Sequence, residues 1–149
     1  MSKRRRVGAR GEMRAAIPLL LLALAAVVAA ESVVLTTTNM ATLLASGAWL
    51  VKFCEPDSAA CQRLAPHWTS AATVLEATSV HVGELDCAAH HVLCRAFGVH
   101  DVPTIKVIEG TVMFTYTGDG STDSIVHFVI EGFVASAREE APQLAAYLA

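Results

Sequence analysis

The sequence predicts an α/β domain with a mixed central sheet flanked by helices on both faces. Short runs rich in β-branched and aromatic residues alternate with segments in which apolar residues recur at helical spacing. Their order is strand, helix, strand, helix, strand, helix, strand, strand, helix, which is typical of a sheet covered on both sides. About 119 residues remain once an N-terminal leader is set aside, enough for one domain with a modest core. This pattern alone leaves several α/β folds open.

Five strands are expected, each short and bounded by turn residues or helical segments. They are residues 33–35, 49–53, 80–86, 104–109 and 112–117.

The segments between these strands predict helices. Leu43 and Leu44 lie in a short first helix, and a long second helix covers residues 58 to about 78, with a kink expected at Pro66. Residues 90–97 form a third helix.

A last helix is expected after the turn that contains Gly118 and Gly120, with Ser121 as its cap. Its apolar residues recur at helical spacing and are Ile125, Phe128, Val129 and Phe133. Pro142 is expected to break this helix, and residues 142–149 are expected to form a loosely packed tail.

The N-terminus has the layout of a signal peptide. Six basic residues and one acidic residue fall within residues 1–14, and an apolar run follows to Ala30, after which we expect cleavage. Sixteen apolar residues span roughly 24 Å as a helix, short of the roughly 30 Å of a bilayer core, so a retained membrane anchor is the weaker interpretation. Met13 is an alternative start that would give a shorter leader.

Without the leader, the domain keeps five basic residues against thirteen acidic ones, a net charge of about −8. This balance argues against nucleic acid as a partner, because phosphate binding needs clustered Lys and Arg. Four cysteines behind a signal peptide indicate an oxidising compartment. We expect no cofactor.

Three stretches resemble the protein disulfide isomerase family. WLVKFCEPDSAACQRLAP at 49–66 is similar to its active-site region, GVHDVPTIK at 98–106 to its G-V-x-x-x-P-T-I-K, and residues 116–126 to its Y-x-G-x-R-x-x-D-x-I-V. The matches cover roughly residues 33–134. The resemblance implies a thioredoxin-like fold for residues 31–141, unfolded or partner polypeptides as ligands, and the endoplasmic reticulum lumen or secretion as location.

The resemblance fails at the attacking cysteine, which is Ser58 here. A serine hydroxyl forms no disulfide, so the dithiol–disulfide cycle cannot run through Ser58 and Cys61. At the position of the family's buried acid this sequence has Lys52. At the position of the family's arginine after the last strand it has Gly120. Three catalytic supports are therefore absent, and we expect a redox-inactive or weakly active domain in which Ser58 caps a helix.

Cys61 is the remaining member of the family's cysteine pair. It is expected to be a small core residue, or alternatively a single reactive thiol whose thiolate Lys52 favours. A bond between Cys54 and Cys61 is possible, but the sequence gives no measure of their separation.

LDCAAHHVLC resembles isomerase-like domains that carry a disulfide at this strand-to-helix corner, which implies a structural Cys87–Cys94 bond. The alternative is a metal site built from Cys87, His90, His91 and Cys94. We favour the disulfide and expect no metal, because the compartment is oxidising.

Pro103, preceded by Val102, matches the family's cis-proline, beside which an extended client segment pairs with the backbone. The alternative is a proline that only shapes a turn. Ser58, Val102 and Pro103 are therefore the expected client-binding residues of a non-catalytic binding module. The competing functions are a thiol–disulfide oxidoreductase acting through the single thiol of Cys61 and a membrane-anchored structural domain.

Overall fold

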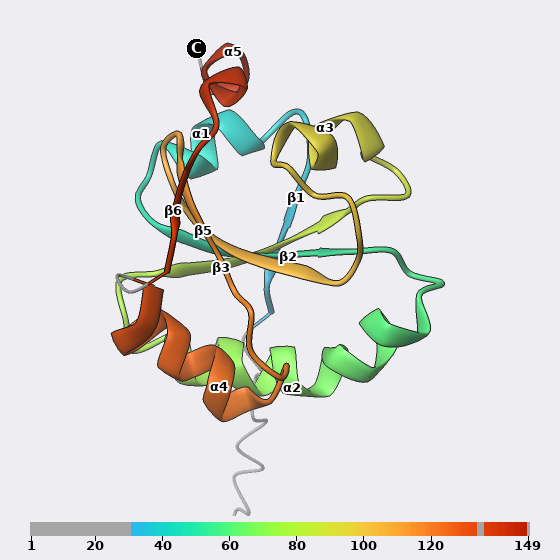
Figure 1. The fold of residues 1–149 in the computed structure, drawn as a ribbon, viewed down its shortest axis with the longest axis vertical. Helices are drawn as coiled ribbons and strands as arrows, with labels where there is room; N and C mark the ends of the chain where they lie inside the picture. Colours follow the sequence, from blue (N-terminus) through green and yellow to red (C-terminus); the bar gives the residue numbers. More distant parts are fainter. Residues whose placement is uncertain (1–30, 134–135, 149) are drawn as a thin grey trace, which may run out of the picture.

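The computed structural model describes residues 31–133 and 136–148 (Figure 1). The expected signal peptide, with its cleavage after Ala30, lies outside the described residues.

A six-stranded mixed sheet forms the centre of the domain, in the order β1-β3-β2-β4-β5-β6. β3 pairs in parallel with β1 and with β2, whereas β4, β5 and β6 add antiparallel strands on the other side of β2. The strands are β1 Val33–Leu35, β2 Trp49–Cys54, β3 His81–Asp86, β4 Thr104–Glu109, β5 Val112–Thr115 and β6 Arg138–Glu140.

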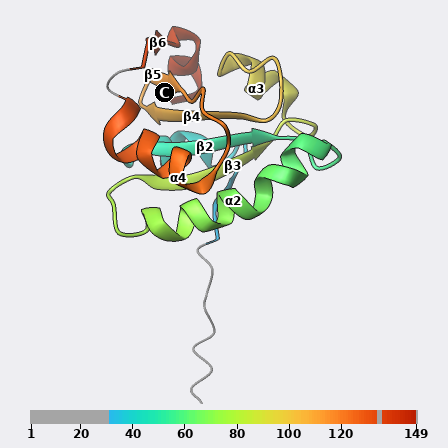
Figure 2. The ribbon, with the colours of Figure 1, turned by 60° about the horizontal axis from the view of Figure 1, so that its bottom comes forward.

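Helices cover both faces of this sheet, as Figures 1 and 2 show. α2 and α4 lie together on one face, and α1, α3 and α5 lie on the other. The helices are α1 Met40–Leu44, α2 Ala59–Leu75, α3 His91–Ala96, α4 Thr122–His127 and α5 Ala145–Leu148. This arrangement is the thioredoxin fold expected from the sequence.

The sheet separates two apolar cores because successive strand side chains point to opposite faces. In β2, Phe53 is buried on the α1 and α3 side, while Leu50 packs on the α2 and α4 side with Trp68 and Ile125. Burying side chains of this size stabilises the fold by about 1.5–3 kcal/mol each. β2 is thus held rigidly from both faces.

α2 begins where the sequence predicts a cap. Ser58 has extended backbone angles, and its hydroxyl oxygen accepts a hydrogen bond from the Cys61 N–H at 3.3 Å. The helix runs without a break through Pro66 and buries one face that includes Leu64 and Trp68. The cap therefore fixes the position of Cys61 in the first turn.

The last long helical segment also starts at its expected cap, since the Ser121 hydroxyl accepts from the Ser124 N–H. α4 passes into a π-helical turn at Phe128–Gly132. Phe128 and Val129 are buried there, as the helical spacing predicts.

The expectation of a loosely packed tail from Pro142 is wrong for the residues that reach the core. β6 pairs with β5, a short 3₁₀ turn follows at Pro142–Leu144, and Leu144 is 1% exposed. Pro142 does not break the preceding helix, because β6 lies between them. The chain after α4 returns to the sheet and closes the core beneath α1 and α5.

β6 also completes a polar cluster inside the domain. Lys106 in β4 is 3% exposed, and its ammonium group donates to Glu139 at 2.7 Å. The hydroxyl of Thr115 donates to the other carboxylate oxygen of Glu139. A buried ammonium requires such a partner, which explains why a charged strand packs at this edge.

Within residues 31–133 and 136–148, no helix combines the length and apolar composition needed to span a membrane.

Candidate functional site

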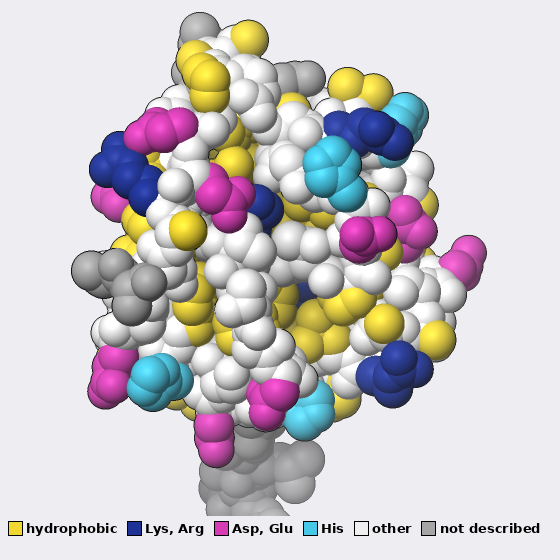
Figure 3. Space-filling view, viewed as in Figure 1, with side chains coloured by type: hydrophobic (Ala, Val, Ile, Leu, Met, Phe, Trp, Pro, Cys, Tyr) yellow, Lys and Arg dark blue, Asp and Glu magenta, His cyan; other side chains and the backbone are white. Residues whose placement is uncertain are grey.

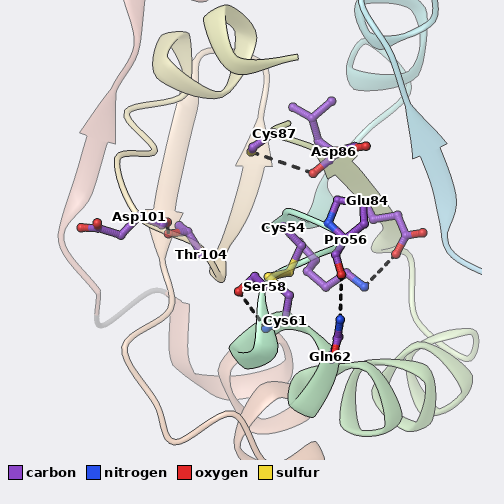
Figure 4. The surroundings of a disulfide bond; sticks show 12 residues. Cys54, Pro56, Ser58, Cys61, Gln62, Glu84, Asp86, Cys87, Asp101 and Thr104 are labelled. Carbon is purple, nitrogen blue, oxygen red and sulfur yellow. Dashed lines mark hydrogen bonds and ion pairs between the residues drawn. A yellow bond between two sulfur atoms is a disulfide. The ribbon is translucent and has the colours of Figure 1, made fainter. Parts of the chain in front are cut away.

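A tight turn joins the end of β2 to α2 and shapes the candidate site. The Ser58 N–H donates to the Glu55 carbonyl at 3.1 Å, with Pro56 and Asp57 as the central residues. The side-chain amide of Gln62 donates to the Pro56 carbonyl at 3.0 Å (Figure 4). The chain therefore reverses within four residues, and the first turn of α2 returns over the end of β2.

This reversal brings Cys54 and Cys61 together in a disulfide, with Cα atoms 5.8 Å apart. The separation lies within the range that disulfides span. The expectation of Cys61 as a single thiol is therefore wrong for this structure. The sequence placed Cys54 at a strand end and Cys61 a turn into a helix, but only the turn at 55–58 decides their distance.

Lys52, which the sequence resemblance aligns with the family's buried acid, lines the same pocket as this disulfide. Its ammonium group pairs with Glu84 of β3 at 2.8 Å and lies 5.4 Å from the centre of the Trp68 ring. No motif in the sequence points to Glu84. Its position beside Lys52 follows from the parallel register of β2 and β3, in which Lys52 is paired with Glu84.

A pocket of about 250 Å³ opens where these groups meet. Cys54, Cys61, Lys52 and Glu84 all line it, together with apolar side chains that include Leu85. Cys61 is 6% exposed, whereas Cys54 is half-buried. The disulfide thus forms part of the wall of an open pocket.

The second disulfide joins Cys87, directly after β3, to Cys94 in α3, with Cα atoms 5.7 Å apart. Both residues are buried in the core on the α1 and α3 side. Oxidised sulfurs are not thiolate ligands, so this arrangement does not form the alternative metal site with His90 and His91. In the described parts of the chain, no group of three His, Cys, Asp or Glu residues has metal-binding geometry.

A separate groove lies on the other side of α2, next to Pro103. The Val102–Pro103 peptide bond is cis. Two adjoining hollows of about 320 and 200 Å³ share Leu64, Pro103, Asp119 and Gly120 in their walls. Ser58 caps the same helix but does not line either hollow.

The loop after β5 forms the far wall of this groove. The Tyr116 hydroxyl donates to Ser124 and accepts from the Gly120 N–H, each at 2.8 Å. Gly120 has φ of +81°, a conformation that favours glycine. The Ser121 N–H donates to Asp119 and holds the pKa of that exposed carboxyl below its ordinary value. No arginine reaches the groove from position 120.

Comparison with known proteins identifies the family. The Thioredoxin family profile matches residues 31–131. The chain belongs to the thioredoxin family. Among its relatives, the protein disulfide-isomerase of Aspergillus niger is 37% identical over 86 residues, covering 57% of this chain and 17% of that protein. Human protein disulfide-isomerase A6 is 42% identical over 69 residues, covering 46% of this chain and 16% of that protein.

Solved structures give the same assignment. The first thioredoxin domain of mouse protein disulfide-isomerase A4 has a TM-score of 0.61 and 27% identity, covering 66% of this chain and 72% of that one. The J-Trx1 fragment of ERdj5 has a TM-score of 0.63 and 25% identity, covering 70% of this chain and 50% of that one. This thioredoxin domain is thus related to protein disulfide isomerases, although the chain spans less than a fifth of the two curated relatives above.

Proposed function

We propose that this domain binds unfolded or partner polypeptides in the secretory pathway, through the groove beside Pro103. It does so without a dithiol–disulfide cycle through Ser58 and Cys61. The observation that carries the proposal is the groove itself, whose walls come from α2, Pro103 and the loop after β5, next to a helix start that has no attacking thiol.

The walls of the groove suit an extended polypeptide. Leu64, Pro103 and Ile105 supply apolar contact, while Arg63 and Asp119 supply opposite charges at its rim. On the face shown in Figure 3, apolar side chains reach the surface between the upper and lower helices, and charged side chains lie mainly around the edge. Such a surface offers contact area with little sequence preference.

The backbone before β4 supplies a second mode of contact. Among the described residues, no hydrogen bond uses the N–H or the carbonyl of Val102, which is half-buried. An extended segment can pair with these groups as an added strand, and main-chain pairing needs no thiol. Binding and thiol chemistry are therefore separable in this fold.

Ser58 serves this function as a helix cap. Its hydroxyl accepts from the Cys61 N–H, which accounts for a serine at this position. The two curated relatives described above are named for disulfide isomerisation, which supports our proposal that the domain acts on folding polypeptides in the endoplasmic reticulum lumen or outside the cell.

The test is polypeptide binding by fluorescence anisotropy, with a labelled, unfolded, cysteine-free polypeptide as probe. Ala60 lines the groove and is half-buried, whereas its neighbour Ala59 is exposed and does not line it. Ala60→Tyr fills the groove and should weaken binding about tenfold, equivalent to about 1.4 kcal/mol.

Ala59→Tyr places the same bulk in the same helical turn and is the matched control, with affinity expected within about twofold of the parent. Equal affinities for both variants, or no binding by the parent domain, would overturn the proposed function.

A further inference from the structure

The two cysteines of the Cys54–Cys61 bond differ in exposure. Cys54 ends β2 and is half-buried, while Cys61 is 6% exposed under the first turn of α2. Both line the 250 Å³ pocket between α2 and β3. A thiolate entering this pocket therefore meets the Cys54 sulfur first.

The surroundings of Cys61 favour its departure as a thiolate. Cys61 is the third residue of α2, where the positive end of the helix dipole stabilises negative charge. Lys52 lines the same pocket, but its ammonium group is paired with Glu84, so the stabilisation comes from the helix start. A stabilised thiolate is the better leaving group in disulfide exchange.

We propose that Cys54–Cys61 is a redox-active disulfide that accepts two electrons from a dithiol of a polypeptide. A substrate thiolate attacks the Cys54 sulfur, the Cys54–Cys61 bond breaks, and Cys61 leaves as the thiolate. The second substrate thiol, as its thiolate, then attacks the substrate sulfur of the mixed disulfide. The substrate is released with one new disulfide, and Cys54 and Cys61 become two thiols by taking up the two protons that the substrate thiols lost.

The pocket also indicates the class of substrate. Val34, Leu85 and Pro56 provide apolar walls, and Val34 is 58% exposed at the mouth. Three carboxylates stand there against one ammonium, from Glu55, Glu84 and Asp86 against Lys52. The pocket therefore suits a cysteine flanked by neutral or basic residues, and it disfavours an anionic thiol.

This site is distinct from the polypeptide groove. The lining residues of the pocket and of the groove do not overlap, because they lie on opposite sides of α2. Binding of a cysteine-free polypeptide tests the groove alone, so failure of one proposal leaves the other standing.

Two single variants of the full chain test which sulfur reacts. Cys61→Ser leaves a thiol on Cys54, and Cys54→Ser leaves one on Cys61. Each is mixed with the symmetrical disulfide of a neutral peptide that contains one cysteine, and the mixed disulfide is measured by mass spectrometry. Because Cys54 is the more accessible cysteine, Cys61→Ser should form the adduct about tenfold faster than Cys54→Ser once each rate is divided by the thiolate fraction of the remaining thiol. Equal rates, or a faster Cys54→Ser, would overturn the attack at Cys54.

The parent protein supplies a second measurement that needs no variant to fold. It is equilibrated in mixtures of reduced and oxidised dithiothreitol, alkylated and mapped by mass spectrometry. We expect a mixture in which Cys54–Cys61 is half reduced while Cys87–Cys94 remains oxidised. Cys54–Cys61 remaining oxidised throughout, or both bonds opening together, would overturn the proposal.

Discussion

The two faces of the sheet carry similar groups in different surroundings. Each has a disulfide between cysteines seven residues apart and one lysine–glutamate pair. On the α3 side, Cys87, Cys94 and Lys106 are at most 5% exposed. On the α2 side, Cys54–Cys61 and Lys52–Glu84 line an open pocket. Equal loop lengths give equal chain entropy, so access and not connectivity distinguishes a structural bond from a reactive one.

The largest difference in stability between the two faces should appear when each disulfide is removed in turn. Closing a loop of this size contributes about 2.5 kcal/mol in the chain-entropy model. Cys54→Ala/Cys61→Ala should lose about that amount. Cys87→Ala/Cys94→Ala also removes sulfur from a closed core and should lose about 3–5 kcal/mol. Denaturant unfolding without reductant measures both, and equal losses would argue against the contrast.

Breaking the lysine–glutamate pair should also cost more unfolding free energy on the closed face than on the open face. Glu139→Gln weakens the partner of a buried ammonium and should cost about 1–2 kcal/mol after discounting for the exposed part of Glu139. Glu84→Gln is the matched variant on the open side and should cost less than about 1 kcal/mol. A larger loss for Glu84→Gln would reverse the assignment of the closed face.

The Glu139 pair also predicts a pH dependence. Burial opposes ionisation of Glu139, but hydrogen bonds from Lys106 and Thr115 outweigh it and hold its pKa below the usual range. The stability gained is fully present above about pH 4.3, the unfolded value, and is lost as pH falls through the lower folded pKa. The difference in unfolding free energy between the parent and Glu139→Gln should therefore shrink in acid. A difference that grows below pH 4 would contradict this sign.

Ser58→Cys should add a thiol at the start of α2 and restore part of the disulfide reductase activity. It weakens the α2 cap, at a cost of about 1 kcal/mol, and places a free thiol beside the Cys54–Cys61 disulfide. Insulin reduction should recover only in part, because Lys52 and Gly120 remain in place of the family's acid and arginine. Ser58→Ala loses the same cap without a thiol and is the control. Full recovery would show that those two departures are unimportant.

The smallest expected effect is the dependence of the reduction rate of Cys54–Cys61 on the charge of the reducing thiol. The carboxylates around the pocket should make the cationic thiol cysteamine reduce Cys54–Cys61 about threefold faster than anionic mercaptoethanesulfonate, at equal thiolate concentration and low salt. The difference should disappear in 1 M salt, whereas Cys87–Cys94 should show no preference at either salt concentration. Faster reduction by the anionic thiol would contradict the proposal that the substrate is a cysteine flanked by neutral or basic residues.

The sequence predicts the parts of this fold that local patterns determine. The capping serines 58 and 121, the apolar strands and the resemblance around Pro103 all place their elements correctly. β6 is not predicted, because Arg138–Glu140 has no apolar alternation and is a strand only through pairing with β5. The burial of Leu144 follows from that pairing.

The candidate site is predicted less completely, because its key distances depend on tertiary contacts. Lys52 and Ser58 are visible as departures from the family pattern. The Cys54–Cys61 bond requires the turn at 55–58, and the Lys52–Glu84 pair requires the register between β2 and β3. A strand-end cysteine seven residues before a helix cysteine was the only sequence signal for the bond.

The most direct measurement is the rate at which dithiothreitol reduces each disulfide in the native parent protein, followed by timed alkylation and peptide mapping. Cys54–Cys61 should open on the order of 100-fold faster, because the Cys87–Cys94 bond reacts only after a local opening that costs about 3 kcal/mol. Equal rates, or faster opening of Cys87–Cys94, would contradict the division of the domain into a closed structural face and an open reactive one.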